Sequence, residues 1–181
     1  IHNMKTLLKA RLLGAEAPDI LMEGSVFSIT LLQECINNKE YERLPAAFKD
    51  TFVKIEAELE QKTDPLRFSA QLDCAMFRYI NDVLNQRKEY GFVRRYFSLS
   101  ADFQNARSVI RARLLHWEQE KLGPLLLPGG EIAHDVFLDV FDTPLEQLGV
   151  ELNRGADGRW IFKEIEDYVA TGNASVFKRS M

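Results

Sequence analysis

One stretch of the chain occurs twice, and this internal repeat limits the possible folds more than any other feature. HNMKTLLKARLL at residues 2–13 aligns with QNARSVIRARLL at residues 104–115, with Asn3 opposite Asn105. Both stretches end in Ala-Arg-Leu-Leu, and most other positions keep a basic, hydroxyl or apolar side chain. Chance does not readily match three kinds of side chain together, so the chain is expected to contain one structural unit more than once.

The repeat continues beyond this motif. In each copy a loop follows, and then a glycine precedes a new apolar stripe, at residues 21–35 and 126–141. Leu21 aligns with Leu127 and Gly24 with Gly130, so the alignment offset grows from 102 to 106 and the second loop is four residues longer. A surface connection tolerates such an insertion. The glycine is expected where the chain turns sharply before entering a helix.

A fainter match lies in the same order along the chain. Residues 64–76 resemble residues 157–169, and the better register places Phe68 on Phe162 and Asp73 on Asp167. We therefore expect residues 1–61 to be the later part of one helical unit, 62–155 a complete unit, and 156–181 the beginning of a further unit.

Helical periodicity dominates the chain, and no convincing alternating strand is present. Prolines fall between the apolar stripes or at their starts, where the missing N–H does least harm. Asp102 is placed to cap the helix that follows it. These patterns predict an all-α protein. The stripes are Met4, Leu7, Leu8, Leu12; Phe48, Phe52, Ile55, Leu59; Phe68, Leu72, Ala75, Met76, Tyr79, Ile80, Val83; Ala106, Val109, Ile110, Leu114; and Trp160, Ile161, Ile165, Tyr168, Val169.

The composition excludes several classes of protein. The chain has 181 residues, of which 46% are hydrophobic and 28% charged, as in a globular protein with a substantial core. A net charge of −4 gives no electrostatic case for nucleic acid or an anionic membrane. No apolar run approaches the roughly 20 residues that cross a bilayer, so membrane contact is expected only through another protein. Cys35 and Cys74 are expected to be reduced core residues of an intracellular protein.

Catalytic motifs are scarce. Glu131 and His134 form an E-x-x-H pair, which supplies metal ligands in di-iron helical bundles. Such a site needs a second pair, and neither His2 nor His116 has a glutamate three residues before it. The sequence contains no phosphate-binding glycine loop and no G-x-S-x-G elbow. We expect no cofactor and no enzyme activity; a metal-dependent helical-bundle enzyme using Glu131 and His134 is the alternative.

Basic residues form a ridge on both copies of the repeat. Lys5 and Lys9 are four residues apart, as are Arg107 and Arg111, and such like-charge pairs repel by about 0.2–0.5 kcal/mol in an isolated helix. The pairs are either solvated or matched by an acidic partner. That partner is an acid of a neighbouring helix, for which Asp73 is favoured, or an acidic surface of another protein of an assembly.

Several of these motifs resemble one protein family. DFQNARSVIRARLL (102–115) resembles the D-x-x-N-x-x-x-x-x-R-A-K segment of the C subunit of bacterial and archaeal V/A-type ATPases, which is the d subunit of the eukaryotic vacuolar enzyme. LLPGGEI resembles the family's glycine-pair segment, and AQLDCAMFRYI (70–80) resembles its L-D-x-x-Y-F helix, with Met-Phe in place of Tyr-Phe. The first copy resembles the preceding family repeat. The residues at the family's motif positions are Asn3, Lys9, Arg11, Gly24, Asp73, Asp102, Asn105, Arg111, Arg113, Gly129 and Gly130, with Arg113 in place of the usual lysine.

The resemblance covers essentially the whole chain and implies a fold and a role without catalysis. Family members are funnels of three helical units related by pseudo-rotation, and this chain resembles roughly the middle of one. The implied role is a rotor spacer on the cytoplasmic side of a membrane, between the D–F shaft and the proteolipid ring. Asp102 would cap a helix, Asn105 and Arg111 would tie neighbouring helices, and the glycines would allow the turn. A generic helical adaptor is a further alternative.

Overall fold

The computed structural model describes residues 1–16, 19–59, 65–86, 88–152 and 158–171. It divides into two compact units, Ile1–Val83 and Leu84–Met181, and each is described by itself. The secondary structure of the described residues consists of helices joined by turns and loops, without strands. The all-α prediction is therefore confirmed.

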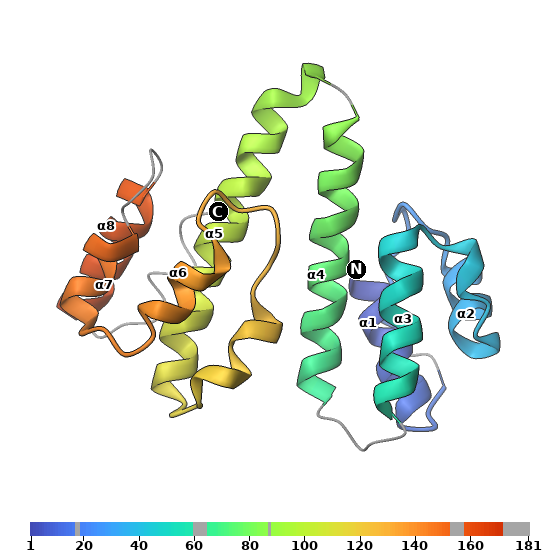
Figure 1. Cartoon of the computed structure of the whole chain (residues 1–181). Helices are drawn as coiled ribbons and strands as arrows, with labels where there is room; N and C mark the ends of the chain where they lie inside the picture. The colour runs from blue at the N-terminus through green and yellow to red at the C-terminus, as the bar shows by residue number, and fades with distance from the viewer. Residues whose placement is uncertain (17–18, 60–64, 87, 153–157, 172–181) are drawn as a thin grey trace. The chain divides into compact units, whose positions relative to one another are not determined.

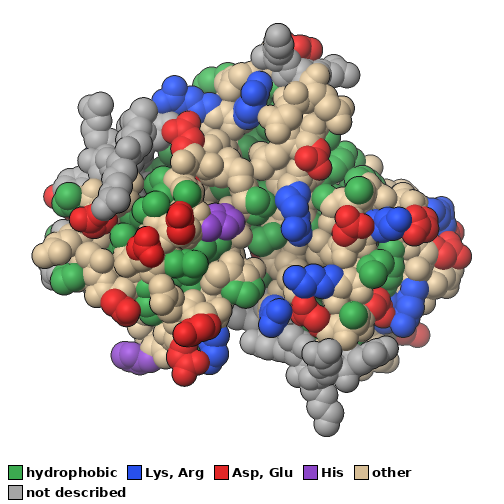
Figure 2. All heavy atoms as spheres, viewed as in Figure 1, with side chains coloured by type: hydrophobic (Ala, Val, Ile, Leu, Met, Phe, Trp, Pro, Cys, Tyr) green, Lys and Arg blue, Asp and Glu red, His purple; other side chains and the backbone are tan. Residues whose placement is uncertain are grey.

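In the described part of the first unit there are four α-helices and one short 3₁₀ helix. α1 spans His2–Leu12, α2 Ile29–Asn38, η1 Tyr41–Arg43, α3 Ala46–Leu59 and α4 Pro65–Asn85, with the boundary between the units in the last turn of α4. Figure 1 shows α3 beside α4, with α1 behind them. On the face drawn in Figure 2, acidic and basic side chains are interspersed over this unit.

Over its described residues, the second unit contains four α-helices and three short 3₁₀ helices. η2 spans Lys88–Tyr90, α5 Gly91–Leu114, η3 Gln119–Lys121, η4 Gly123–Leu125, α6 His134–Asp139, α7 Leu145–Leu152 and α8 Gly158–Thr171. α7 and α8 pack against each other. None of the helices in the described ranges has the length and apolar character that spanning a bilayer requires.

The predicted apolar stripes form the two cores. Met4, Leu8, Phe52 and Ile55 are buried in the first unit. Ala106, Val109 and Ile110 are buried in the second, together with residues of α6, α7 and α8. Leu114 departs from its stripe, because it ends α5 and half of its surface is exposed, at 51%. The side chains of Trp160, Ile161 and Val169 lie outside the described residues.

The starts of the helices follow from local sequence. Pro45 and Pro144 directly precede α3 and α7, and in both cases the proline carbonyl accepts the first helical N–H bonds. Pro65 is the first residue of α4, a position at which its fixed φ suits the helix. The Ser28 hydroxyl caps α2 by accepting from the Leu31 N–H at 3.2 Å. Prolines thus separate the stripes as the sequence predicted.

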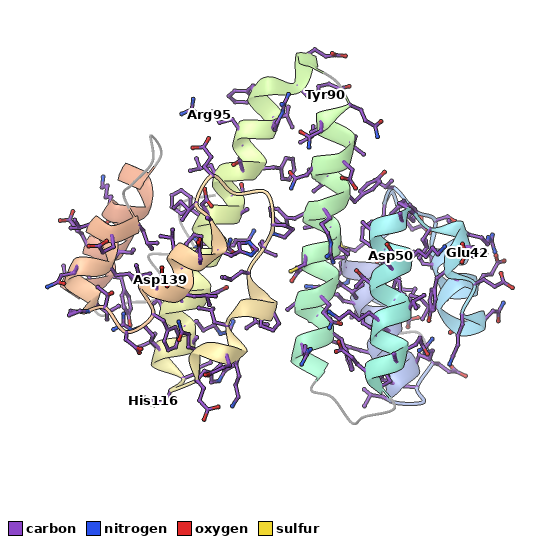
Figure 3. The ribbon with its side chains drawn as sticks, viewed as in Figure 1. Glu42, Asp50, Tyr90, Arg95, His116 and Asp139 are labelled. Carbon is purple, nitrogen blue, oxygen red and sulfur yellow. The ribbon has the colours of Figure 1, made fainter. Side chains whose placement is uncertain are left out.

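The predicted role of Asp102 as a helix cap is wrong. α5 begins at Gly91, directly after Tyr90 (labelled in Figure 3), so Asp102 lies in the middle of a 24-residue helix. The start was misplaced because Asp102 precedes the strongest apolar stripe, whereas the residues before it carry a weaker pattern. Asp102 is nevertheless buried, at 3% exposure, and its carboxylate binds backbone elsewhere.

Candidate functional site

Asn3 joins α1 to the loop before α2. Its Nδ2 donates to the Met22 carbonyl at 2.7 Å, and its Oδ1 accepts from the Met22 N–H at 2.8 Å. One amide side chain thereby satisfies both backbone groups of one residue, as a neighbouring strand would. We call this pair of bonds the first asparagine anchor.

Asn105 makes the same pair of bonds in the second unit. Its Nδ2 donates to the Leu127 carbonyl at 2.9 Å, and its Oδ1 accepts from the Leu127 N–H at 2.7 Å. This second asparagine anchor is fully buried, since Asn105 has 0% and Leu127 5% exposure. His134 Nε2 also donates to the Leu127 carbonyl, at 2.9 Å. Both repeated asparagines are thus helical and hold a loop in the same manner.

The anchors correct the alignment of the loops by one residue. They place Leu127 opposite Met22, whereas the sequence alignment placed it opposite Leu21. The offset is therefore 105, and Gly24 corresponds to Gly129. Both glycines have positive φ, +74° and +91°, in the left-handed region that favours glycine. The predicted turn before α2 and α6 is present in both units, and Gly24 is sufficient for it in the first.

Gly130 lets the carboxylate of Asp102 approach the backbone. Asp102 Oδ2 accepts from the Glu131 N–H at 2.8 Å, and Oδ1 accepts from the Ile132 N–H at 3.2 Å. A Cβ on Gly130 would lie 2.8 Å from Cγ of Asp102 and closer still to Oδ1. The two family glycines therefore act differently: Gly129 supplies the turn, and Gly130 supplies the space.

Arg11 is the centre of a polar network in the first unit. Its Nη1 donates to the Ile36 carbonyl in the last turn of α2 at 2.5 Å and to Tyr41 Oη at 2.9 Å, and its Nη2 donates to Glu56 Oε1. Tyr41 Oη donates in turn to Glu56 at 2.7 Å, and Lys39 Nζ lies 2.9 Å from the other carboxylate oxygen. The network connects α1, α2, η1 and α3.

This environment shifts two pKa values. Burial raises the pKa of Glu56, but the hydrogen bonds from Arg11, Lys39 and Tyr41 outweigh it and hold that pKa below its usual value. Burial, followed by the hydrogen bond to Glu56, raises the pKa of Tyr41 to about 12. Glu56 is therefore ionised and Tyr41 neutral at physiological pH, which keeps every bond of the network formed.

The Glu56→Gln variant tests this network by pH. At pH 7 the change should lower the free energy of unfolding of the first unit by about 1 kcal/mol, because Arg11 and Lys39 lose their carboxylate. The pKa of Glu56 is lowered on folding, so this stabilisation is present above the unfolded pKa of roughly 4.5 and is lost as the pH falls through the lower folded value. Urea unfolding of both chains at pH 7 and pH 3 measures the difference.

Glu42→Gln is the matched control. Glu42 pairs with Lys49 at 2.7 Å, but its side chain is 79% exposed. This variant should unfold like the parent chain at both pH values. An equal effect of the two substitutions would contradict the assigned role of the Arg11 network.

In the second unit the tie expected of Arg111 is made by Arg113. Arg113 Nη1 donates to the Thr143 carbonyl, between α6 and α7, at 2.5 Å. Arg111 is exposed and makes no hydrogen bond or ion pair with the residues that the structure describes. Arg113 corresponds to Arg11 in the repeat, so in both copies the arginine of the Ala-Arg-Leu-Leu segment binds a carbonyl at or after the second helix.

The predicted partner of the basic ridge is confirmed for one lysine. Lys5 Nζ lies 2.6 Å from Oδ2 of Asp73 and so connects α1 with α4. Lys9 is exposed and has no such contact among the described residues. The Lys5→Ala change should lower the free energy of unfolding of the first unit by roughly 0.5 kcal/mol at low salt and by less at high salt, because the ion pair is partly exposed.

The comparison of Lys5→Ala with Lys9→Ala separates the ion pair from loss of surface charge in general. Amide hydrogen exchange of α1 is measured in both variants. The Lys9→Ala change should leave the exchange rates of α1 unchanged. A double-mutant cycle with Asp73→Ala isolates the coupling between Lys5 and Asp73. Zero coupling at low salt would contradict the pairing.

Comparison with known proteins gives one family match. The family described as ATP synthase (C/AC39) subunit matches the chain over residues 1–181. The chain belongs to this family. Neither the curated proteins nor the solved structures compared with the chain give a match.

The ATP synthase (C/AC39) family consists of the non-catalytic C, or d, subunits of V/A-type ATPases. Glu131 and His134 were the metal pair of the alternative interpretation: in the structure the backbone N–H of Glu131 donates to Asp102, and the His134 ring donates to the Leu127 carbonyl. Over the described ranges no three His, Cys, Asp or Glu residues form a metal-binding group. Cys35 and Cys74 are buried and form no disulfide, and burial raises the pKa of each thiol.

Three members of the polar network in this C/AC39 chain were missed from the sequence. Tyr41, Glu56 and Lys39 match no motif, and they come together only when α2, η1 and α3 pack on α1. One signal was available: Glu56 is the acid that follows the apolar position Ile55 in α3, on the side of that helix next to the buried face. That signal alone does not select Arg11 as its partner.

Proposed function

We propose that this chain is a non-catalytic central-stalk subunit of a V/A-type ATPase. It joins the shaft formed by the D and F subunits to the membrane proteolipid ring and transmits torque between them. Its place is peripheral, on the cytoplasmic side of the membrane. The observation that carries the proposal is the match of the ATP synthase (C/AC39) subunit family to every residue of the chain.

The internal contacts suit a part that transmits force. The first and second asparagine anchors fix the loops before α2 and α6 to the preceding helices. Arg11 and Arg113 fix the ends of the second helices, and both cores are closely packed clusters of apolar side chains. Close-packed interiors have low compressibility, so each unit should deform little under torque.

The repeat itself is the second part of the proposal. Units bounded at residues 1–61, 62–155 and 156–181 would be related by pseudo-rotation, as in a three-unit funnel. The equal bonding of Asn3 and Asn105 supports this, as does the positive φ of Gly24 and Gly129. An experimental structure tests it: one rotation should superpose each anchor and its flanking helices on the other. Anchors that superpose only separately would contradict the rotation.

Binding to the shaft tests the role. The folded chain should co-elute with a purified D–F complex at moderate salt, and it should hydrolyse no ATP by itself. The Gly123→Ala variant should bind the D–F complex as well as the parent chain does. The Gly130→Ala variant should bind it less, in proportion to the fraction of the variant that is unfolded. Absence of co-elution with all partners folded would contradict the proposed function.

A further inference from the structure

Two cations of the repeated motif have no partner among the residues that the structure describes. Lys9 and Arg111 occupy the same position of the repeat, and both side chains are exposed. Neither makes a hydrogen bond or an ion pair with the described residues, although Lys5, one turn before Lys9, binds Asp73. For these two cations, the acidic partner that the basic ridge predicts is therefore to be sought outside the described units.

An exposed leucine follows each cation by four residues. Leu13 is 81% exposed and Leu115 is 49% exposed. The Leu13 N–H donates to the Lys9 carbonyl and the Leu115 N–H donates to the Arg111 carbonyl, both at 3.0 Å. These are regular α-helical bonds, so each leucine shares a helix face with its cation. We call Lys9 with Leu13 the first surface pair and Arg111 with Leu115 the second surface pair.

The two helices also end in the same way. After the leucine the chain turns through a residue of positive φ, which is Gly14 at +62° in α1 and His116 at +52° (labelled in Figure 3) in α5. The N–H of the next residue then donates back to the carbonyl of Ala10 or of Ala112, at 2.9 Å in both units. The two surface pairs therefore occupy equivalent places on matching helix ends.

The surface pairs are retained although buried positions of the same helices differ between the copies. Met4 corresponds to Ala106 and Leu7 to Val109, and all four are buried. No contact of the described residues requires the cation or the leucine. A single exposed leucine is ordinary, but an exposed leucine one turn after an exposed cation in both copies indicates an external contact that both units make.

The chemistry of the pairs selects the kind of partner. A cation one turn from an exposed leucine fits an acidic side chain beside an apolar hollow. Two copies of the pair require two copies of that site, so the partner presents the same surface more than once. A ring of like subunits presents such a surface, whereas a shaft formed by two different subunits, D and F, does not.

We propose that each surface pair binds one subunit of the proteolipid ring, through an acidic side chain and an adjacent apolar hollow of that subunit. This inference rests on the proposed function, which supplies the ring, and it assigns the surface of each unit that contacts the ring. Each unit binds through its own pair.

Binding of the full chain to the detergent-solubilised proteolipid ring tests the leucines. The Leu13→Ser/Leu115→Ser variant should bind the ring about 30-fold more weakly than the parent chain. Burial of an exposed leucine is worth roughly tenfold in affinity, and burial of the half-exposed Leu115 is worth less. Binding to the D–F complex, measured separately, should be unchanged.

The same assay tests the cations. The Lys9→Glu/Arg111→Glu variant should bind the ring about tenfold more weakly at low salt, because both cations would face an acid. The difference should shrink at high salt, which screens charges, whereas the effect of the leucines should persist. Binding of this variant to the D–F complex should also equal that of the parent chain.

Matched controls carry the same substitutions on other exposed faces. Val53→Ser/Val150→Ser changes two valines that are 54% and 59% exposed. Lys54→Glu/Lys163→Glu makes the same change in net charge at two exposed lysines. Both controls should bind the ring as the parent chain does. All four variants should unfold at the urea concentration of the parent chain, because every substituted side chain is exposed.

The proposal and the proposed function fail in different ways. Ring binding that the leucine and charge variants leave intact would overturn the proposal, with the proposed function still standing. A parent chain that binds neither the ring nor the D–F complex would contradict both. A lower urea midpoint of the leucine variant would mean that the chain itself covers the pairs, and it too would overturn the proposal.

Two further measurements test the repetition and the class of partner. Lys9→Glu/Leu13→Ser and Arg111→Glu/Leu115→Ser each alter one unit, and each should weaken ring binding. A loss confined to one of them would contradict a partner that repeats. The parent chain should not bind protein-free vesicles of phosphatidylcholine and phosphatidylglycerol. Vesicle binding that the charge variant abolishes would assign the pairs to lipid and overturn the proposal.

Discussion

Replacing Gly130 with alanine should lower the free energy of unfolding of the second unit by about 4 kcal/mol. The new Cβ would lie 2.8 Å from Cγ of Asp102, so either the loop or the α5 side chain must move. Movement breaks the bonds from the Glu131 and Ile132 N–H groups to a carboxylate that is 3% exposed. Hydrogen bonds to charged groups are worth about 1.5–3 kcal/mol each, and a buried charge left unpaired adds to the loss.

Gly123→Ala is the matched control for this prediction. Gly123 begins η4 in the same unit, has no heavy atom within 4 Å of a built Cβ, and does not have positive φ. The free energy of unfolding of the Gly123→Ala variant should lie within about 0.5 kcal/mol of that of the parent chain. The two tryptophans, Trp117 and Trp160, both belong to the second unit, so urea unfolding followed by tryptophan fluorescence reports on it directly. Similar midpoints for the two alanine variants would contradict the role given to Gly130.

The helices could be predicted because their apolar spacing and their breakers agree. Phe48, Phe52 and Ile55 repeat at helical spacing after Pro45, and they are the buried face of α3. The pairing of Lys5 with Asp73 could also be predicted as one of the alternatives for the basic ridge, since Asp73 lies on a long amphipathic helix. Such features depend on sequence neighbours within one helix, or on one charge pair.

The remaining contacts depend on where loops and distant helices meet. The capping rule for Asp102 uses only its chain neighbours, whereas its real partners lie 29 and 30 residues later. The one-residue error in aligning Leu127 arose because apolar similarity alone cannot distinguish Leu21 from Met22. Only the hydrogen bonds of the anchors make that choice. Arg113 was passed over for Arg111 because both are basic and two residues apart, so the sequence alone does not show which of them contacts the neighbouring helix.

The two asparagine anchors should differ in strength although their bonds are alike. Asn105→Leu keeps the size of the side chain but leaves the Leu127 N–H without its acceptor in a site that is almost fully buried, with Leu127 at 5% exposure. A buried, unsatisfied backbone group costs about 1–3 kcal/mol. The hydrogen bond from Asn105 to the Leu127 carbonyl is lost as well. We therefore expect the free energy of unfolding of the second unit to fall by about 3 kcal/mol.

Asn3→Leu should cost about 1 kcal/mol in the first unit, because Met22 is 60% exposed and water can replace the lost side chain at its backbone groups. Amide exchange of α1 and α5 gives both values in the same experiments, since each helix reports on its own unit. Equal losses would mean that the anchors act through bond geometry alone. A larger loss of stability for Asn105→Leu than for Asn3→Leu would show that burial determines how much each copy of the repeated contact contributes to the free energy of unfolding of its unit.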